Sequence, residues 1–342
     1  MVGRGRLGYV PALDGIRAIA IVLVVSRHFW GRPLGGGYGV DVFFVLSGFL
    51  ITTLLLEEHA RDGAIALRAF YMRRARRLLP ALFTMLGLAT LILSLAVSPT
   101  KLLETIGPPA LYASNFVRAY VKPDWMAGSP ADHLWSLAEE EQFYLVWPVA
   151  LIFMLRRRVQ LVRVLAILVA ALVAYRFAWI ALGANPGRIH YSPDTHAEGL
   201  MLGCLLAALR GRGFLPPAWL GWVGLAAIAV IAKVQMPHLW VYGLPIVELA
   251  SALVIAAAVQ PGLVQRALSV RPLVYIGVIS YSIYVWHQFV HWLFLWGHPN
   301  WSAAVTVLFA VGSYHLVEKR FRHARPAPLR SSPMPVPAPL GS

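Results

Sequence analysis

The sequence predicts an all-α integral membrane protein, a bundle of about ten transmembrane helices with both termini in the cytoplasm. Its composition favours this class, because 58% of the 342 residues are hydrophobic and only 13% are charged. In soluble domains about a quarter of the residues are charged. The sequence also contains a succession of apolar runs, most of them near the roughly 17 to 25 residues that cross a bilayer as a helix.

The apolar runs give the expected order of the spans. They lie at about 13–30, 40–56, 78–98, 134–154, 160–183, 197–210, 216–233, 239–260, 272–294 and 301–318, and the sixth is short. With a cytoplasmic N-terminus, more than two thirds of the 30 Lys and Arg residues fall on the cytoplasmic side, as the positive-inside rule requires. We therefore expect a multi-pass protein of the plasma or inner membrane.

The segments outside the spans carry most of the charge. The net charge of +15 belongs to these loops and does not indicate nucleic-acid binding. The loop at about 99–132 is expected to form a partly ordered cap over the outer face. Residues 1–325 are expected to form the membrane domain, and the Pro/Ser-rich residues 326–342 a disordered cytoplasmic tail. The single cysteine, Cys204, excludes an intramolecular disulfide and a Cys-rich metal site.

The first span carries two ionisable side chains that are costly inside a bilayer and therefore indicate function. Arg17 and His28 are eleven residues apart, which is about 16 Å along a helix. Asp41, at the outer end of the second span, could reach the imidazole of His28 and orient it as a general base. A lone histidine in a span also serves as an interhelical hydrogen-bond link, so the prediction depends on Asp41.

An arginine cluster, Arg73, Arg74 and Arg77, enters the third span from the cytoplasm. Such a cluster anchors a protein to anionic lipid in many membrane proteins. Arg77 lies about one helical turn from both Arg73 and Arg74. With Arg17 at the same depth, these guanidinium groups could clamp phosphates.

The stretch HLWSLAEEEQFY, which enters the fourth span from outside, combines polar and aromatic residues. Glu140 and Glu141 lie one to two turns inside the span, where a carboxylate either takes part in chemistry or neutralises a buried arginine. Glu141 is the candidate for a second acid or base. His133, Trp135, Ser136 and Glu140 are predicted to contact a hydroxylated acceptor.

Two further clusters contain histidines. His196 and Glu198, near Asp194, crowd the outer end of the sixth span, but they do not share a helical face, so a metal site is not expected there. His287 and His291 have the i, i+4 spacing that permits metal binding, yet they lie in an aromatic stretch typical of an interfacial anchor. No metal site is predicted.

These segments together resemble acyltransferase family 3, a family of ten-span membrane O-acyltransferases, over about residues 8–325. The matching stretches are YVPALDGIRAIAIVLVVSRH, GGYGVDVFFVLSGFLIT, FYMRRARRLLP, HLWSLAEEEQFYLVWP and GVISYSIYVWH. The resemblance implies transfer of an acyl group from cytoplasmic acyl-CoA to a hydroxyl of a glycan or of a macrolide-type product. It maps the family's arginine–histidine motif onto Arg17 and His28, its arginine motif onto Arg73, Arg74 and Arg77, and its paired glutamates onto Glu140 and Glu141.

The chain departs from the family pattern before the sixth span, where His196 and Glu198 replace the usual arginine and aspartate. Because that region is thought to face the acceptor, His196 and Glu198 are acceptor-binding candidates and the acceptor's identity stays open. We expect acyl-CoA as a co-substrate, no permanently bound cofactor, and His28 as general base. A transient acyl-His28 intermediate is the alternative route.

Two other functions compete with acyl transfer. A proton-coupled transporter or flippase could use His28, Glu140 and Glu141 as a proton relay, but it predicts inverted repeats, which the sequence does not show. A scaffold would not need charged groups inside the membrane.

Overall fold

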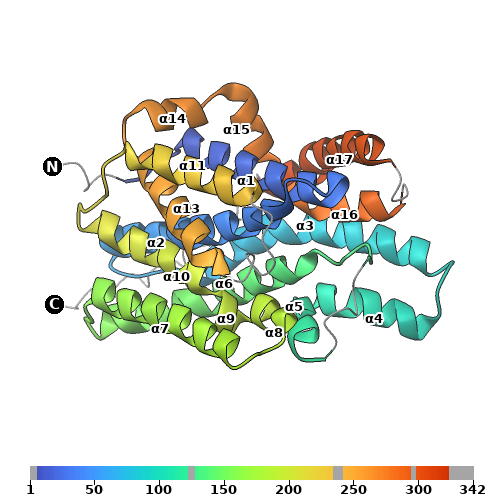
Figure 1. The fold of residues 1–342 in the computed structure, drawn as a ribbon, viewed down its shortest axis with the longest axis horizontal. Coiled ribbons are helices and arrows are strands. Elements are labelled where there is room, and N and C mark those ends of the chain that lie inside the picture. The colour runs from blue at the N-terminus through green and yellow to red at the C-terminus, as the bar shows by residue number, and fades with distance from the viewer. Residues whose placement is uncertain (1–5, 122–127, 234–241, 294–297, 323–342) are drawn as a thin grey trace, which may run out of the picture.

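The structure is a computed structural model, and it describes residues 6–121, 128–233, 242–293 and 298–322. Within these ranges the chain is helical and contains no strand. Most of the long helices run side by side along the long axis of the molecule (Figure 1). The predicted tail, 326–342, lies outside the described residues.

The helices begin and end close to the predicted spans. In chain order they are α1 (Pro11–Trp30), η1 (Leu34–Tyr38), α2 (Gly39–Asp62), α3 (Leu67–Leu93), α4 (Pro99–Ala110), α5 (Ser114–Phe116), η2 (Val117–Val121), α6 (Leu134–Arg156), α7 (Leu161–Ala181), α8 (Pro186–Tyr191), α9 (Pro193–His196), α10 (Glu198–Gly211), α11 (Leu220–Lys233), α13 (Leu244–Ala258), α14 (Leu263–Leu268), α15 (Arg271–Val278), α16 (Ser280–Leu293), α17 (Pro299–Ser313), η3 (Tyr314–Glu318) and α18 (Lys319–Arg322).

Each predicted span contains a described helix, although some helices are shorter than the apolar run: 94–98 follow α3 and 216–219 precede α11. Two of the spans also differ in form from the expectation. The third helix begins eleven residues earlier than predicted, at Leu67, so the arginine cluster lies inside α3. The ninth predicted span is two helices, α15 and α16, which meet at an angle of 65°. The loop expected at 99–132 is largely helical where it is described, in α4, α5 and η2.

Fewer than ten of the described helices are both long enough and apolar enough to cross a membrane. Three of them meet both conditions alone, at Leu34–Asp62, Leu67–Leu93 and Leu161–Ala181, and the bent pair α15–α16 makes a fourth. The first helix and α6 carry several charged residues, and α11 and α13 are short. The structure is therefore that of a helical protein with several membrane-compatible helices.

Local sequence explains the limits of α1. Pro11 occupies the first turn, where its missing N–H has no helical partner to lose. Gly31 follows Trp30 with φ of 66°, a left-handed conformation that ends a helix. Between them an apolar face packs against α15, so both Arg17 and His28 lie on a well-anchored helix.

The close packing of α2 against α10 depends on two glycines. A Cβ atom on Gly48 would lie 2.0 Å from the carbonyl oxygen of Leu200, and one on Gly203 would lie 2.1 Å from that of Val45. The two backbones therefore touch directly. Asp41 lies seven residues, or two turns, before Gly48, so it shares this face and points toward the segment that precedes α10.

We expect Gly203→Ala to lower the free energy of unfolding by roughly 1–3 kcal/mol, because the added methyl group overpacks this contact. Thermal unfolding of the purified protein in detergent measures the effect. Gly211→Ala, in the same helix, is the control, since no atom lies within 4 Å of its Cβ position. Equal unfolding midpoints for the two variants would contradict the packing described here.

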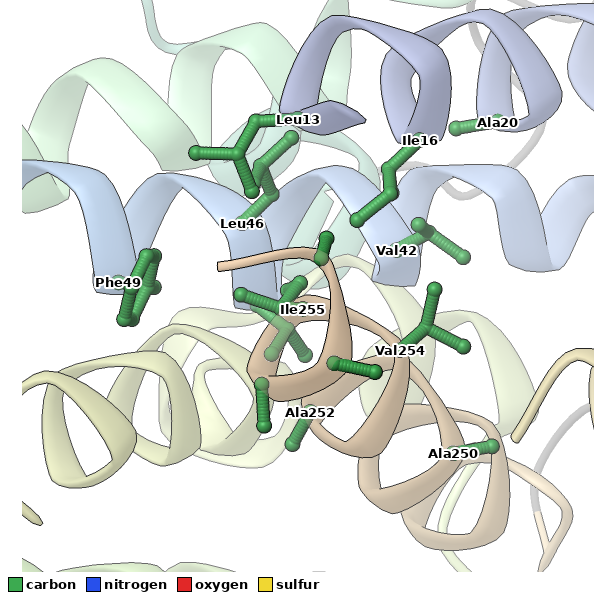
Figure 2. Close-up of a cluster of buried hydrophobic side chains, with 14 of the residues drawn as sticks. Leu13, Ile16, Ala20, Val42, Leu46, Phe49, Ala250, Ala252, Val254 and Ile255 are labelled. Atoms are coloured by element: carbon green, nitrogen blue, oxygen red, sulfur yellow. The ribbon is translucent and has the colours of Figure 1, made fainter. Parts of the chain in front are cut away.

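A hydrophobic core joins α1, α2 and α13. Leu13, Ile16 and Ala20 of α1 lie above Val42, Leu46 and Phe49 of α2, and Val254 and Ile255 of α13 lie below them (Figure 2). All of these side chains are buried. The core holds α1, which carries Arg17 and His28, and α2, which carries Asp41, in a fixed relative position.

Candidate active site

A cavity of about 690 Å³ lies between α1, α2, α3, α6 and the α15–α16 pair. Basic side chains that the predicted topology places on the cytoplasmic side line part of it, namely Arg17, Arg74, Arg77 and Lys319. Hydroxyl and carboxylate groups line another part, namely Ser47, Ser136, Glu140, Tyr144, Tyr281 and Tyr284. The cavity thus combines cations suited to an anionic ligand with groups that can orient a polar reactant.

The arginines of α3 separate into two groups. Arg74 stacks on the ring of Tyr144 at 3.2 Å and lies 3.6 Å from Glu141. Arg77, nearly one turn later, also lines the cavity. Arg73 does not line it, because its side chain is 63% exposed and lies 3.7 Å from Glu58. The geometry therefore favours Arg74 with Arg77 over the alternative pairing of Arg73 with Arg77.

Arg17 enters the cavity from the first helix, where it is paired with Asp14, one turn earlier. Its Nη1 atom lies 3.1 Å from the Asp14 carboxylate, and the guanidinium is largely buried. Because both residues line the same cavity, Asp14 fixes the position of the arginine without removing it from the site.

The two glutamates of α6 have different surroundings. Glu140 lines the cavity and accepts hydrogen bonds from the hydroxyls of Ser47 and Tyr144. Glu141 does not line the cavity and forms the ion pair with Arg74. Of the two predicted roles for these carboxylates, neutralisation of a buried arginine describes Glu141, whereas Glu140 faces the space in which a ligand fits.

His28 lies near the other end of α1 and outside the lining of the cavity. Its Nδ1 atom is 2.9 Å from the carbonyl oxygen of Val24 and 3.3 Å from Nε2 of His287 in α16. His287 in turn contacts the backbone of Tyr284, which lines the cavity. Two contacts, one of them to the backbone of Tyr284, therefore connect His28 to a residue of the cavity lining.

The predicted contact between Asp41 and His28 is wrong. Asp41 instead accepts a hydrogen bond from Nε2 of His196 at 2.8 Å, and both side chains are buried. The reason is the Gly48–Gly203 packing, which turns the Asp41 face of α2 toward α10 and away from His28. The pairing also accounts for His196, which donates through its other nitrogen to the carbonyl of His190.

Glu198, the other departure from the family pattern, forms an ion pair with Arg176 of α7 at 2.5 Å. Both side chains are completely buried. Neither His196 nor Glu198 lines the cavity. The structure thus places these two acceptor-binding candidates in buried ion pairs behind it.

The other predicted acceptor contacts at the start of α6, His133, Trp135 and Ser136, also differ in whether they line the cavity. Ser136 lines the cavity, and its hydroxyl lies 2.5 Å from that of Tyr284. His133 is buried with its ring 4.7 Å from that of His287. Trp135 stacks on His196 at 5.6 Å and contributes to packing. Only Ser136 of this trio is in a position to touch a ligand in the cavity.

Asp194 forms a separate ion pair in the loop between α7 and α10. Arg188 donates to its two carboxylate oxygens at 2.9 and 2.6 Å, and Ser192 donates to one of them. Burial alone would raise the pKa of Asp194, but these hydrogen bonds lower it below its ordinary value. The pair fixes the shape of this loop rather than presenting a reactive group.

No group of three or more potential metal ligands occurs among the residues that the structure describes. His287 and His291 are both buried in α16, against Phe29 of α1. These positions do not match the interfacial anchor that the aromatic stretch predicted, because His287 packs inside the bundle.

Residues 10–314 match a family described as an acyltransferase domain. The chain belongs to this acyltransferase family. It is 32% identical over 350 residues to "Putative peptidoglycan O-acetyltransferase YrhL" of Bacillus subtilis (strain 168), a match that covers 92% of this chain and 55% of that protein. It is 34% identical over 309 residues to "Peptidoglycan O-acetyltransferase OatA" of Listeria monocytogenes serovar 1/2a (strain ATCC BAA-679 / EGD-e), covering 82% and 49% of the two chains.

This acyltransferase-family chain spans about half the length of the curated relatives it matches. No solved structure was found to match it.

Reasoning from the sequence missed several residues of the site. The sequence pattern does not distinguish Ser47 and Tyr144, which donate to Glu140, and it contains Tyr284 only as one residue of an aromatic stretch. The sequence offered one clue to Tyr144, since it follows Glu140 by four residues and so lies on the same helical face. Nothing local pointed to Ser47, which comes from another helix.

Proposed function

We propose that this chain is a multi-pass O-acyltransferase of the plasma or inner membrane, with ten spans and both termini in the cytoplasm. It moves an acetyl or other short acyl group from cytoplasmic acyl-CoA to a hydroxyl of a carbohydrate or macrolide-type glycosylated acceptor. The proposal rests on family membership and, above all, on one observation: a single cavity brings Arg17, Arg74 and Arg77 together with Ser136 and Glu140. The relatives' names favour a glycan over a macrolide as the acceptor.

In the proposed reaction, the arginines hold the phosphates of acyl-CoA on the cytoplasmic side, and the pantetheine arm extends along the first helix. The acceptor's hydroxyl oxygen forms a bond with the thioester carbonyl carbon as the carbon–sulfur bond breaks. His28 takes the hydroxyl proton, and this proton then passes to the departing CoA thiolate, which leaves as the free thiol while the imidazole returns to its neutral form. His28 is exposed in the last turn of α1, about three turns from Arg17, where we expect an outer acceptor to approach it.

The route through an acyl-His28 intermediate gives the same products in two steps. Mass spectrometry of the protein after brief exposure to acyl-CoA alone distinguishes the two routes, because only the intermediate adds one acyl group to the protein.

The decisive experiment uses the purified protein in lipid nanodiscs with acetyl-CoA and a panel of glycan and macrolide acceptors. Release of free CoA, together with a gain of one acetyl group by an acceptor, supports the proposal. A protein that releases no CoA with any acceptor, yet moves a substrate across vesicles when a proton gradient is applied, is a transporter, and acyl transfer is then excluded.

A matched pair of arginine variants tests the donor site. Arg77→Ala is expected to raise the KM for acetyl-CoA by about ten- to a hundredfold, because a charge-assisted hydrogen bond to a phosphate is lost. Arg73→Ala is expected to leave the KM within about threefold of wild type, since Arg73 is exposed outside the cavity. Steady-state kinetics with saturating acceptor measures both. Equal effects at the two positions would point to lipid anchoring instead of donor binding.

A further inference from the structure

The hydrogen bonds of His28 determine which of its nitrogens carries the proton. A backbone carbonyl can only accept a hydrogen bond. Because Nδ1 of His28 lies 2.9 Å from the carbonyl oxygen of Val24, the hydrogen of the neutral ring is on Nδ1. The lone pair is therefore on Nε2, which is the atom left to take a proton from an acceptor.

The neighbouring ring of His287 is fixed by the same reasoning. Its Nδ1 atom lies 2.6 Å from the carbonyl oxygen of Tyr284, so it donates there and leaves a lone pair on Nε2. That Nε2 atom is 3.3 Å from Nδ1 of His28. The Nδ1–H group of His28 is thus shared between the Val24 carbonyl and the His287 lone pair, and the two tautomers are mutually consistent.

We propose that His287 is a positioning residue for His28, holding it in the Nδ1–H tautomer and accepting its hydrogen bond while Nε2 takes up the acceptor's proton. This inference rests on the proposed function. The imidazole of His287 thus takes the role of orienting His28, which the sequence analysis predicts for the carboxylate of Asp41. That carboxylate is buried against His196 and does not contact His28.

The surroundings of His287 suit such a role. The residue is completely buried, so no solvent competes for its lone pair. The ring of His133 packs edge-on against it at 4.7 Å, and Phe29 lies 6.2 Å away on its other neighbouring helix. Its ring and that of His28 have centroids 5.0 Å apart. The ring is therefore held in one orientation by packing as well as by Tyr284.

Two substitutions at this position separate hydrogen bonding from packing. In His287→Asn the side-chain amide can still donate to the Tyr284 carbonyl, but it is too short to reach His28. In His287→Gln the amide oxygen can occupy the place of Nε2 and accept from His28. We expect His287→Asn to lower kcat by about ten- to a hundredfold, the effect of one lost hydrogen bond to a group that becomes charged. The KM values for acetyl-CoA and acceptor should not change, and His287→Gln should restore kcat to within a few-fold of wild type.

The outcomes separate this inference from the proposed function. If the wild-type protein transfers no acyl group, the proposed function fails. If wild type is active and His28→Ala is inactive, but His287→Asn has wild-type kcat, only the role of His287 is overturned. Equal losses in the Asn and Gln variants, or losses that appear in KM, likewise overturn it in favour of a purely structural role.

A second measurement does not require any His287 variant to fold. Nitrogen-15 NMR of wild-type protein labelled at histidine, with His28 assigned by its absence in His28→Ala, reports the tautomer directly. Protonation at Nδ1 of His28 supports the inference, and protonation at Nε2 overturns it.

Discussion

Replacement of His28 by alanine is expected to reduce kcat for acetyl transfer by about a hundred- to ten-thousandfold, the usual contribution of a general base. The loss should appear in kcat because the imidazole acts on the reacting hydroxyl, while Arg17, Arg74 and Arg77 still hold the donor. Isothermal titration with acetyl-CoA should accordingly show unchanged donor affinity.

The matched control is His59→Ala. His59 lies in the last turn of α2 and outside the cavity, so this variant should keep wild-type kcat. A folded His28→Ala protein with near-wild-type turnover would exclude both the general-base role and the acyl-His28 intermediate. Acyl transfer would then have to be assigned to another group on the cavity, of which Glu140 is the best placed.

The positions of the helices could be predicted because the succession of apolar runs along the sequence carries that information. Each predicted span contains a described helix, including the short sixth one, which contains α10. The break between α15 and α16 was not predicted, because residue 279 is an isoleucine within a run whose overall hydropathy suits one continuous span, and no proline marks the break.

The rotation of each helix about its axis was harder to predict, and the site depends on it. Asp41 and His28 come from adjacent helices, so a contact between them was a fair expectation. The backbone contact at Gly48 and Gly203 fixes the rotation of α2 about its axis. As a result Asp41 forms its hydrogen bond with His196 and not with His28. Since this contact joins segments about 150 residues apart in sequence, no local pattern reveals it.

The arginine cluster shows the same difficulty within a single helix, because the sequence does not tell which side chain faces the cavity. Arg73 and Arg74 lie on neighbouring faces of one helix, and both are close to one turn from Arg77. Spacing alone could not select between them. In the structure the two differ: Arg74 contacts Tyr144 and Glu141 of α6, whereas the side chain of Arg73 is exposed.

The buried ion pair between Arg176 and Glu198 supports the largest expected effect on stability. Both side chains have no exposed surface, and Arg176 is among the largest fully buried side chains of the described residues. Two further carboxylates, Glu139 and Glu248, are buried and have oxygens without a hydrogen-bond partner in the described structure. Arg176 therefore compensates the charge of Glu198 in a region that holds two further buried carboxylates.

Arg176→Met is expected to lower the free energy of unfolding by about 3–5 kcal/mol, because it leaves Glu198 as a buried charge without its partner. Arg163→Met makes the same change on the exposed side of the same helix and should stay within about 0.5 kcal/mol of wild type. Thermal unfolding in a single detergent compares the two variants.

The double variant Arg176→Met/Glu198→Leu should recover a large part of the loss, since replacing both members of a buried pair by apolar groups removes the uncompensated charge. If the double variant is no more stable than Arg176→Met, the guanidinium stabilises the fold through Glu139 and Glu248 as much as through Glu198. The rate of acetyl transfer by the folded double variant then shows whether the ion pair affects catalysis apart from its effect on stability. Neither residue lines the cavity, so kcat should remain close to wild type wherever the protein is folded.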